Sequence, residues 1–231
     1  MRAISSMATR HLLGELIEAA TAAGLPEVTL ESVGGVEAAA RVSAGERVDL
    51  VFLASDALQR LAVEGHVDEA SLTPLVRSQV AIAVPSHSDA MAVTPGMPAF
   101  GDADGVKGAL RAATRVGYST GPSGIALLEM IEGWGMTAEI GERLVQARPG
   151  VPVAGLLADG EVDLGFQQLS ELAGQPGVRI LGVLPADCAI DTVFSGAVAT
   201  EASDAAEARS ILNFFVSATA PLVAGHGFDT A

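Results

Sequence analysis

The sequence predicts an α/β fold built in two lobes that are joined by two long strands. Two observations indicate this class. Short aliphatic strands alternate with Ala-rich helices from the start of the chain, and the order βαβαβα favours a parallel sheet with right-handed crossovers. Hydrophobic residues make up 49% of the 231 residues and aromatic residues only 4%. This mixture is typical of α/β layers rather than of an aromatic-rich sandwich.

The first βα series starts at the N-terminus. Apolar residues recur at helical spacing from Leu12 onward and predict a helix that ends near Ala23. Segment 49–53 is almost continuously apolar, which is typical of a strand buried on both faces. Ser55 is expected to cap the helix that follows. The other elements expected here are strands at 2–4 and 28–31 and helices at 36–44 and 55–64.

The second βα series follows a surface loop at 85–105 that is rich in Gly, Pro, Ser and Asp. Its expected strands lie at 115–118, 144–147, 162–166 and 178–183, and its expected helices at 105–113, 123–134 and 151–159.

Two longer strands, at 75–85 and 188–200, are expected to join the two series, and helices at 203–217 and from about Ala220 end the chain. These last elements return to the first series, so the chain crosses between the lobes twice, once along each long strand, and lobe one is made of two separate segments. Lobe one is assigned to 1–82 and 193–231, and lobe two to 83–192. We expect a ligand to bind between the lobes, at the C-terminal ends of their strands.

Charge and composition exclude several classes of partner. The chain carries 13 basic and 28 acidic residues, a formal net charge of −15, so nucleic acid and anionic membrane are repelled at long range. An apolar run of about 18 residues, which a membrane-spanning helix needs, is absent from the sequence. Cys188 is the single cysteine and the four histidines lack ligand spacing, so we expect neither a metal site nor a cofactor.

The N-terminus enters a strand directly, without an apolar stretch or a cleavage site. This start predicts a cytoplasmic protein, or a periplasmic one if the N-terminus has been trimmed.

Four βα loops contain residues suited to holding an anion. The first is 5–9, where Ser5, Ser6 and Met7 precede a helix whose N-terminus carries about half a positive charge. Arg10 follows in the first helical turn and faces either the ligand or solvent. In the alternative interpretation, Ser6 or Thr9 caps the helix and binds nothing.

The second loop contains Gly34 and Gly35, which permit positive φ and a close approach of ligand to backbone; a tight turn without a ligand is the alternative. The third loop, 117–124, gives the strongest indication. It follows a strand, opens a helix and alternates hydroxyls with glycines, a pattern typical of an N–H nest for phosphate or carboxylate. Its candidate ligand-binding residues are Ser119, Thr120, Gly121 and Ser123. A Walker loop is excluded because Ile125 stands where the lysine belongs.

The fourth loop, 148–152, offers Arg148, Gly150 and Val151. Arg148 suits a bidentate contact with a carboxylate, and a solvated loop charge is the alternative. Gln167 and Gln168 lie just past the strand expected at 162–166 and place amide groups near the same edge.

Several segments together resemble the molybdate-binding-protein family of periplasmic receptors. The resemblance rests on residues 44–56, 58–65, 75–85, 153–166 and 182–185, in the same order along the chain. It implies the type II periplasmic-binding-protein fold, with two hinge strands, an anion cleft and delivery of the ligand to an ABC transporter when the protein is exported. The chain departs from the family where its oxyanion-binding serines are expected, near Met7 and at Gly35 or Val36, and Gln167 or Gln168 replaces its tyrosine.

Two functions follow from these observations. The first is a receptor, similar to solute-binding proteins, that binds an oxyanion or an organic carboxylate. The second is an isomerase, because proteins similar to this family include one that interconverts cis- and trans-aconitate. Arg10, Arg148 and the glutamines suit carboxylates, and Ser119, Ser6 and His11 are the available proton carriers. No residue is assigned a catalytic role.

Overall fold

A computed structural model describes residues 1–89, 97–148 and 150–231 and shows two compact units. Unit 1 comprises Met1–Ser78 with Thr192–Ala231, and unit 2 comprises Gln79–Asp191. The chain passes from unit 1 to unit 2 within β4 (Thr73–Pro85) and returns at the start of β9 (Asp191–Val198). The predicted α/β class is confirmed, since strands and helices alternate in both units.

The sheet of unit 1 has a parallel centre. β1 (Arg2–Ser6) lies between β2 (Thr29–Val33) and β3 (Leu50–Ala54), and both neighbours run parallel to it. Next to β3, β9 runs antiparallel, and β10 (Asp229–Thr230) pairs antiparallel with β4. Because the three parallel strands end at one edge, the residues that follow them are brought together there.

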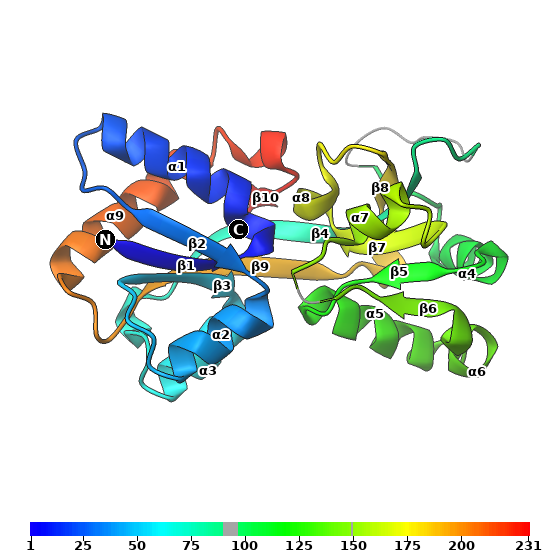
Figure 1. Ribbon diagram of the computed structural model, residues 1–231, viewed down its shortest axis with the longest axis horizontal. Coiled ribbons are helices and arrows are strands. Elements are labelled where there is room, and N and C mark those ends of the chain that lie inside the picture. Colours follow the sequence, from blue (N-terminus) through cyan, green and yellow to red (C-terminus); the bar gives the residue numbers. More distant parts are fainter. Residues whose placement is uncertain (90–96, 149) are drawn as a thin grey trace. The chain divides into compact units, whose positions relative to one another are not determined.

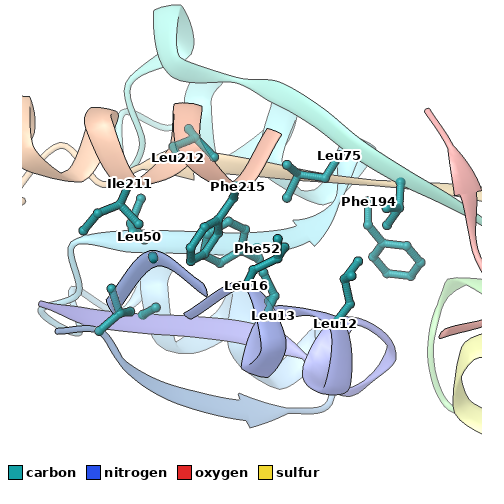
Figure 2. Close-up of a cluster of buried hydrophobic side chains, with 14 of the residues drawn as sticks. Leu12, Leu13, Leu16, Leu50, Phe52, Leu75, Phe194, Ile211, Leu212 and Phe215 are labelled. Atoms are coloured by element: carbon teal, nitrogen blue, oxygen red, sulfur yellow. The ribbon is translucent and has the colours of Figure 1, made fainter. Parts of the chain in front are cut away.

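Helices cover both faces of this sheet (Figure 1). The helices α1 (Arg10–Ala22) and α9 (Ala205–Thr219) lie on one face, and α2 (Gly35–Ser43) and α3 (Ser55–Val63) lie on the other. Figure 2 shows the core beneath α1 and α9, where leucines of both helices surround the ring of Phe52. The Phe52 ring stacks on Phe215 with 5.7 Å between ring centroids. Short 3-10 helices at Met7–Thr9, Glu69–Ser71 and Val223–His226 complete unit 1.

Unit 2 repeats the layered arrangement. In its sheet, β7 (Leu164–Gln168) lies between antiparallel β4 and parallel β5 (Val116–Tyr118). Beyond β5 lies parallel β6 (Leu144–Gln146), and β8 (Val178–Val183) pairs antiparallel with β4. One apolar cluster draws on α4 (Ala103–Ala112), α5 (Pro122–Gly133) and α6 (Thr137–Ile140), and a separate cluster on α7 (Val153–Ala158) and α8 (Leu169–Leu172). Residues Gly141–Arg143 and Ala186–Cys188 form 3-10 helices.

Several predicted boundaries were wrong in an informative way. The strand expected at 2–4 continues through Ser6, because Ser5 and Ser6 keep register with Ser32 and Val33 of β2. The strand expected from 188 begins at Asp191, since Cys188 belongs to a 3-10 turn whose N–H donates to the Pro185 carbonyl. Burial and the neighbouring Asp187 raise the pKa of the Cys188 thiol to about 11.

The loop predicted at 85–105 is only partly a surface loop. Residues 90–96 of it lie outside the described residues. Pro98 forms a parallel bridge with Val183 of β8, and the Ala99 N–H donates to the Val183 carbonyl. Gly182, at φ +148, is required there, because a Cβ would lie 2.3 Å from the Met97 carbonyl oxygen.

Candidate functional site

Ser5 and Ser6 end β1 with their side chains in different surroundings. The Ser5 hydroxyl is fully buried, lies 2.8 Å from the Ser32 hydroxyl of β2 and donates to the Ser6 carbonyl at 3.1 Å. These contacts are internal to the sheet. Ser5 therefore joins β1 to β2 at the edge where the loops begin.

The Ser6 side chain is the unexplained polar group at this edge. Its residue is 6% exposed, and its Oγ has no hydrogen-bond partner among the described residues. Ser6 lies beside the first residue of α2, because a Cβ built on Gly35 would be 3.5 Å from the Ser6 Cβ. A buried hydroxyl without a partner costs about 1–3 kcal/mol. Such an atom in a well-packed protein calls for an explanation, and a bound ligand is one.

The interpretation of Ser6 or Thr9 as a helix cap was wrong. Neither side chain accepts a hydrogen bond from a helical N–H. The Thr9 hydroxyl instead donates to the Ser6 carbonyl at 3.3 Å. The N-terminus of α1 therefore has no side-chain cap, and its first turn contains no acidic residue.

The paired glycines do not use positive φ, contrary to the prediction. Gly34 has φ −56, and Gly35 is the first residue of α2 with a negative φ as well. A helix start needs only extended and then right-handed backbone, which any residue adopts. The space around Gly34 is open, because a Cβ added there would meet no atom within 4 Å. Because Gly34 and Gly35 have no side chains, the backbone at the N-terminus of α2 is accessible.

Arg10, Met7 and His11 lie at the start of α1. Met7 is half-buried in the 3-10 turn, whereas Arg10 is exposed and has a guanidinium nitrogen 2.9 Å from the His11 Nε2. Partial burial, followed by the charges of Arg10 and His226, lowers the pKa of His11. His11 is therefore kept neutral to lower pH than an ordinary histidine and can accept a proton.

The third predicted loop forms a tight turn over the start of α5. The Ser119 hydroxyl lies 3.0 Å from the buried Ser123 hydroxyl, and Thr120 and Gly121 are half-buried between them. Gly124 is required, because a Cβ there would lie 1.9 Å from the Ser119 carbonyl oxygen. The 12-residue α5 begins at Pro122 without a side-chain cap and without an acidic residue in its first turn. This N-terminus therefore has an uncompensated partial positive charge.

In the fourth loop one backbone N–H group forms a hydrogen bond within the loop itself. The Val151 N–H donates to the Arg148 carbonyl at 2.9 Å around Gly150, whose φ is +77. Pro149 lies outside the described residues. The Arg148 side chain is exposed and forms no ion pair with a described carboxylate. The exposed Arg148 guanidinium is therefore the group of this loop that is available to contact an anion.

Gln167 and Gln168 form the buried end of their strand, whereas the prediction placed them just past it. β7 extends through both residues because Gln167 and Gln168 pair with Ala81 and Val80 of β4. The Gln167 Oε1 accepts a 2.8 Å hydrogen bond from the Val153 N–H at the start of α7. Gln167 therefore joins β7 to α7 and fixes the segment that carries Val151.

Sequence reasoning missed one pair of hydroxyls. The prediction that Ser55 caps α3 was wrong, since Ala54 occupies the cap position. The Ser55 hydroxyl donates to the Val193 carbonyl at 3.0 Å and lies 2.6 Å from the Ser195 hydroxyl on β9. The position of Ser55 directly after β3 was a usable signal, because it shares the sheet edge with Ser6 and Gly34.

Two negative findings apply to the described part of the chain. No group of three or more His, Cys, Asp or Glu side chains there is arranged to hold a metal ion. None of its helices combines the length and the apolar character that crossing a membrane requires.

Comparison with known proteins gives consistent matches over the whole chain. Residues 1–229 match the sequence model of a family described as bacterial extracellular solute-binding protein. An aconitate isomerase from Pseudomonas sp is 30% identical over 213 residues, which cover 91% of this chain and 79% of that protein.

Two solved structures show the same fold at low sequence identity. The periplasmic molybdate-binding protein of Azotobacter vinelandii has a TM-score of 0.77 at 18% identity, with 100% of this chain and 99% of that chain covered. The sulfate-binding protein SubI of Mycobacterium tuberculosis H37Rv has a TM-score of 0.74 at 17% identity, with 100% and 86% covered.

Proposed function

Because the chain belongs to the family of bacterial extracellular solute-binding proteins, we propose that it binds a small anion, an oxyanion or an organic carboxylate. The family and the fold that the resemblance implied, a type II periplasmic-binding-protein fold, are confirmed by the matches. The identity of the anion and delivery to an ABC transporter belong to the proposal.

The unpartnered hydroxyl of Ser6 is the observation that carries this proposal. It is buried at the sheet edge of unit 1, beside the uncapped N-terminus of α2. A hydroxyl can donate to an anion, and helix N–H groups stabilise negative charge in the same place. The first turn of α2 also contains Glu37, which is 3.9 Å from Arg41; Arg41 pairs more closely with Glu31 and Glu46, each at 2.6 Å, so Glu37 reduces the positive charge at this N-terminus.

Electrostatics in unit 2 support the same conclusion. The chain has 28 acidic residues, yet α5 starts with no carboxylate in its first turn. The hydroxyls of Ser119 and Ser123 lie next to that N-terminus. With a net charge of −15, attraction of an anion depends on such local dipoles rather than on the field of the whole protein.

A thermal-shift panel tests the proposal. Molybdate, tungstate, sulfate, phosphate, and di- and tricarboxylates are added singly, and a true ligand raises Tm by an amount that grows with the logarithm of its concentration once that exceeds Kd. Ser6→Ala should reduce affinity about tenfold, which corresponds to about 1.4 kcal/mol. The unliganded variant should be as stable as the parent or more so, because an unsatisfied buried hydroxyl has been removed.

Ser210→Ala is the matched control. Ser210 is exposed on α9, where its hydroxyl donates to the Ala206 carbonyl within the helix. The proposal is wrong if no anion in the panel stabilises the protein. It is also wrong about Ser6 if Ser6→Ala and Ser210→Ala bind the ligand equally well.

A second candidate function is isomerisation of an unsaturated tricarboxylate. It is favoured by the 30% identity to an aconitate isomerase over 91% of the chain. Such a reaction removes a proton beside a carboxylate and returns one elsewhere, so it needs a proton acceptor and a stabilised enolate. His11, near the start of α1, is the candidate acceptor, because its lowered pKa keeps its imidazole neutral. Incubation with cis-aconitate in heavy water distinguishes the candidates, since only an isomerase introduces deuterium and forms trans-aconitate.

A further inference from the structure

We infer that the bound anion is an organic acid with a hydrocarbon skeleton, rather than a compact inorganic oxyanion. This inference rests on the proposed binding of an anion and specifies the class of ligand. It is carried by apolar side chains that are exposed to water beside the candidate anion-binding groups, and by arginines that no described carboxylate neutralises.

Three large apolar side chains are exposed at the starts of helices or in the loops before them. Val36, the second residue of α2, is 60% exposed; Ile125, the fourth residue of α5, is 53% exposed; and Val151, before α7, is 42% exposed. Side chains on a helix tilt toward its N-terminus. Val36 and Ile125 therefore present methyl groups beside the N–H groups that we propose to hold the anion.

In unit 1 this apolar surface adjoins the unpartnered hydroxyl. Val36 follows Gly35, whose Cβ position is 3.5 Å from the Ser6 Cβ. In unit 2, Ile125 follows Gly124, which packs against the Ser119 carbonyl. Each unit thus places one polar anion-binding element and one exposed aliphatic side chain on adjoining residues.

An inorganic oxyanion gives such side chains nothing to contact. Its surface consists of oxygen atoms, and apolar groups next to it would impede its hydration without a compensating contact. A carbon skeleton removes apolar surface from water when it lies against them, which is favourable. Ligand sites in general combine mainly apolar walls with a few polar groups that fix orientation.

The arginines near these loops agree with a carboxylate. Arg41, Arg60 and Arg111 are examples of arginines whose charge is paired with a carboxylate. Arg10 lies against His11 instead, and Arg148 has no ion-pair partner among the described residues. A guanidinium presents a planar fork that matches a carboxylate in a bidentate contact.

An isothermal titration series tests the inference. The ligands are sulfate and molybdate on one side, and oxalate, succinate, glutarate and propane-1,2,3-tricarboxylate on the other. Oxalate carries two carboxylates without intervening carbon, so it separates the effect of charge from that of the skeleton. We expect at least one of the longer acids to bind ten times or more tighter than oxalate, sulfate and molybdate.

The variants Val36→Ser and Ile125→Ser examine the apolar contacts, with Val63→Ser as control. Val63 is 80% exposed at the end of α3, away from the loops that follow the strands. Each of the first two substitutions should lower the affinity for the best organic acid about threefold to tenfold and leave any affinity for sulfate unchanged. Val63→Ser should change neither.

The outcomes separate this inference from the proposed function. If sulfate or molybdate binds more tightly than every organic acid, anion binding stands and the inference is overturned. The inference is also overturned if Val36→Ser and Ile125→Ser bind the best organic acid as tightly as Val63→Ser does. If no ligand of either class binds, the proposed function itself has failed.

Discussion

The hydroxyl of Ser55 lies 2.6 Å from that of Ser195 and joins the start of α3 to β9. Ser195 is 4% exposed, and it lies near the position at which the chain re-enters unit 1. Ser55 keeps a second partner in the Val193 carbonyl at 3.0 Å. The pair therefore anchors the returning strand to the edge at which the parallel strands of unit 1 end.

Replacing Ser195 by Ala should lower the free energy of unfolding by about 1 kcal/mol, the usual net value of one hydrogen bond. The loss is modest because Ser55 retains the Val193 carbonyl. Urea denaturation followed by circular dichroism measures it, with Ser210→Ala as the reference. A loss of less than a few tenths of a kcal/mol would show that the hydroxyl pair does not stabilise unit 1.

Gly124→Ala should disrupt the loop before α5. The added Cβ would lie 1.9 Å from the Ser119 carbonyl oxygen, so either the loop or the first helical turn must move. We expect a loss of about 2–3 kcal/mol in stability, as for other changes that overpack a close contact, and more than tenfold weaker anion binding.

Gly108 provides a matched control for this substitution. It lies within α4, and a Cβ there meets no atom within 4 Å. Gly108→Ala should therefore stabilise the protein by about 0.5–1 kcal/mol through helix propensity. Equal effects of Gly124→Ala and Gly108→Ala would contradict the described geometry of the loop.

Ser123→Ala and Arg148→Ala should each weaken anion binding more than they weaken the fold. Arg148 is exposed without an ion pair among the described residues, so its loss should leave Tm nearly unchanged. A charged hydrogen bond to a ligand is worth about 1.5–3 kcal/mol, which corresponds to roughly tenfold to a hundredfold in Kd. Titration calorimetry and thermal unfolding of the same samples give both numbers. Unchanged affinity in both variants would place the anion elsewhere.

Asp49→Asn should destabilise unit 1 at neutral pH. Burial by itself raises the pKa of Asp49, but hydrogen bonds from the Arg2 N–H at 2.7 Å and from the N–H and hydroxyl of Ser203 at 2.8 and 2.7 Å lower it overall. We expect a loss of about 3 kcal/mol at pH 7, since contacts with a buried charged group are removed.

The pH dependence of this effect has a definite sign. A carboxyl with a lowered folded-state pKa stabilises the protein above its unfolded pKa, here 3.8, and loses that contribution as the pH falls through the folded-state pKa. The difference between parent and Asp49→Asn should therefore be constant at neutral pH and shrink below about pH 4. Urea midpoints measured between pH 7 and pH 3 check this. A difference that grows in acid would contradict the described network.

His11→Gln should reduce the acid sensitivity of α1. Partial burial, Arg10 and His226 lower the pKa of His11, so the unfolded chain takes up a proton at higher pH than the folded protein. The parent therefore loses stability as the pH falls below about 6.5, and the variant lacks this loss. Glu15, 3.2 Å from His226, also faces the cluster, so the comparison uses the difference between the two proteins. Parallel Tm curves from pH 7.5 to 5.5 would contradict the prediction.

Much of the fold was predictable because its signals are local. The leucines from Leu12 onward repeat at helical spacing and are buried on α1. The apolar run that became β3 is buried on every residue, as its lack of alternation indicated. The strand expected at 178–183 has the bounds Val178–Val183 in the structure, because a Gly precedes it and a Pro follows closely after it.

The ends of the strands were harder to predict, and most of the candidate site lies there. Ser5, Ser6, Gln167 and Gln168 have polar side chains that are typical of loops, yet all four belong to strands. Their partners come from distant sequence: Ser32 for Ser5, and the Val153 N–H for Gln167. Sequence patterns report periodicity along one segment, so they cannot reveal a hydrogen bond that forms only after two segments pack together.

Hydrogen–deuterium exchange with and without the best anion from the panel tests the central claim most directly. We expect slower exchange at the helix starts that carry the candidate groups, which are residues 5–10 and 34–37 in unit 1 and residues 119–125 in unit 2. Ser6→Ala should lose much of that protection in unit 1 at the same ligand concentration. Protection confined to other segments would contradict anion binding at these helix starts.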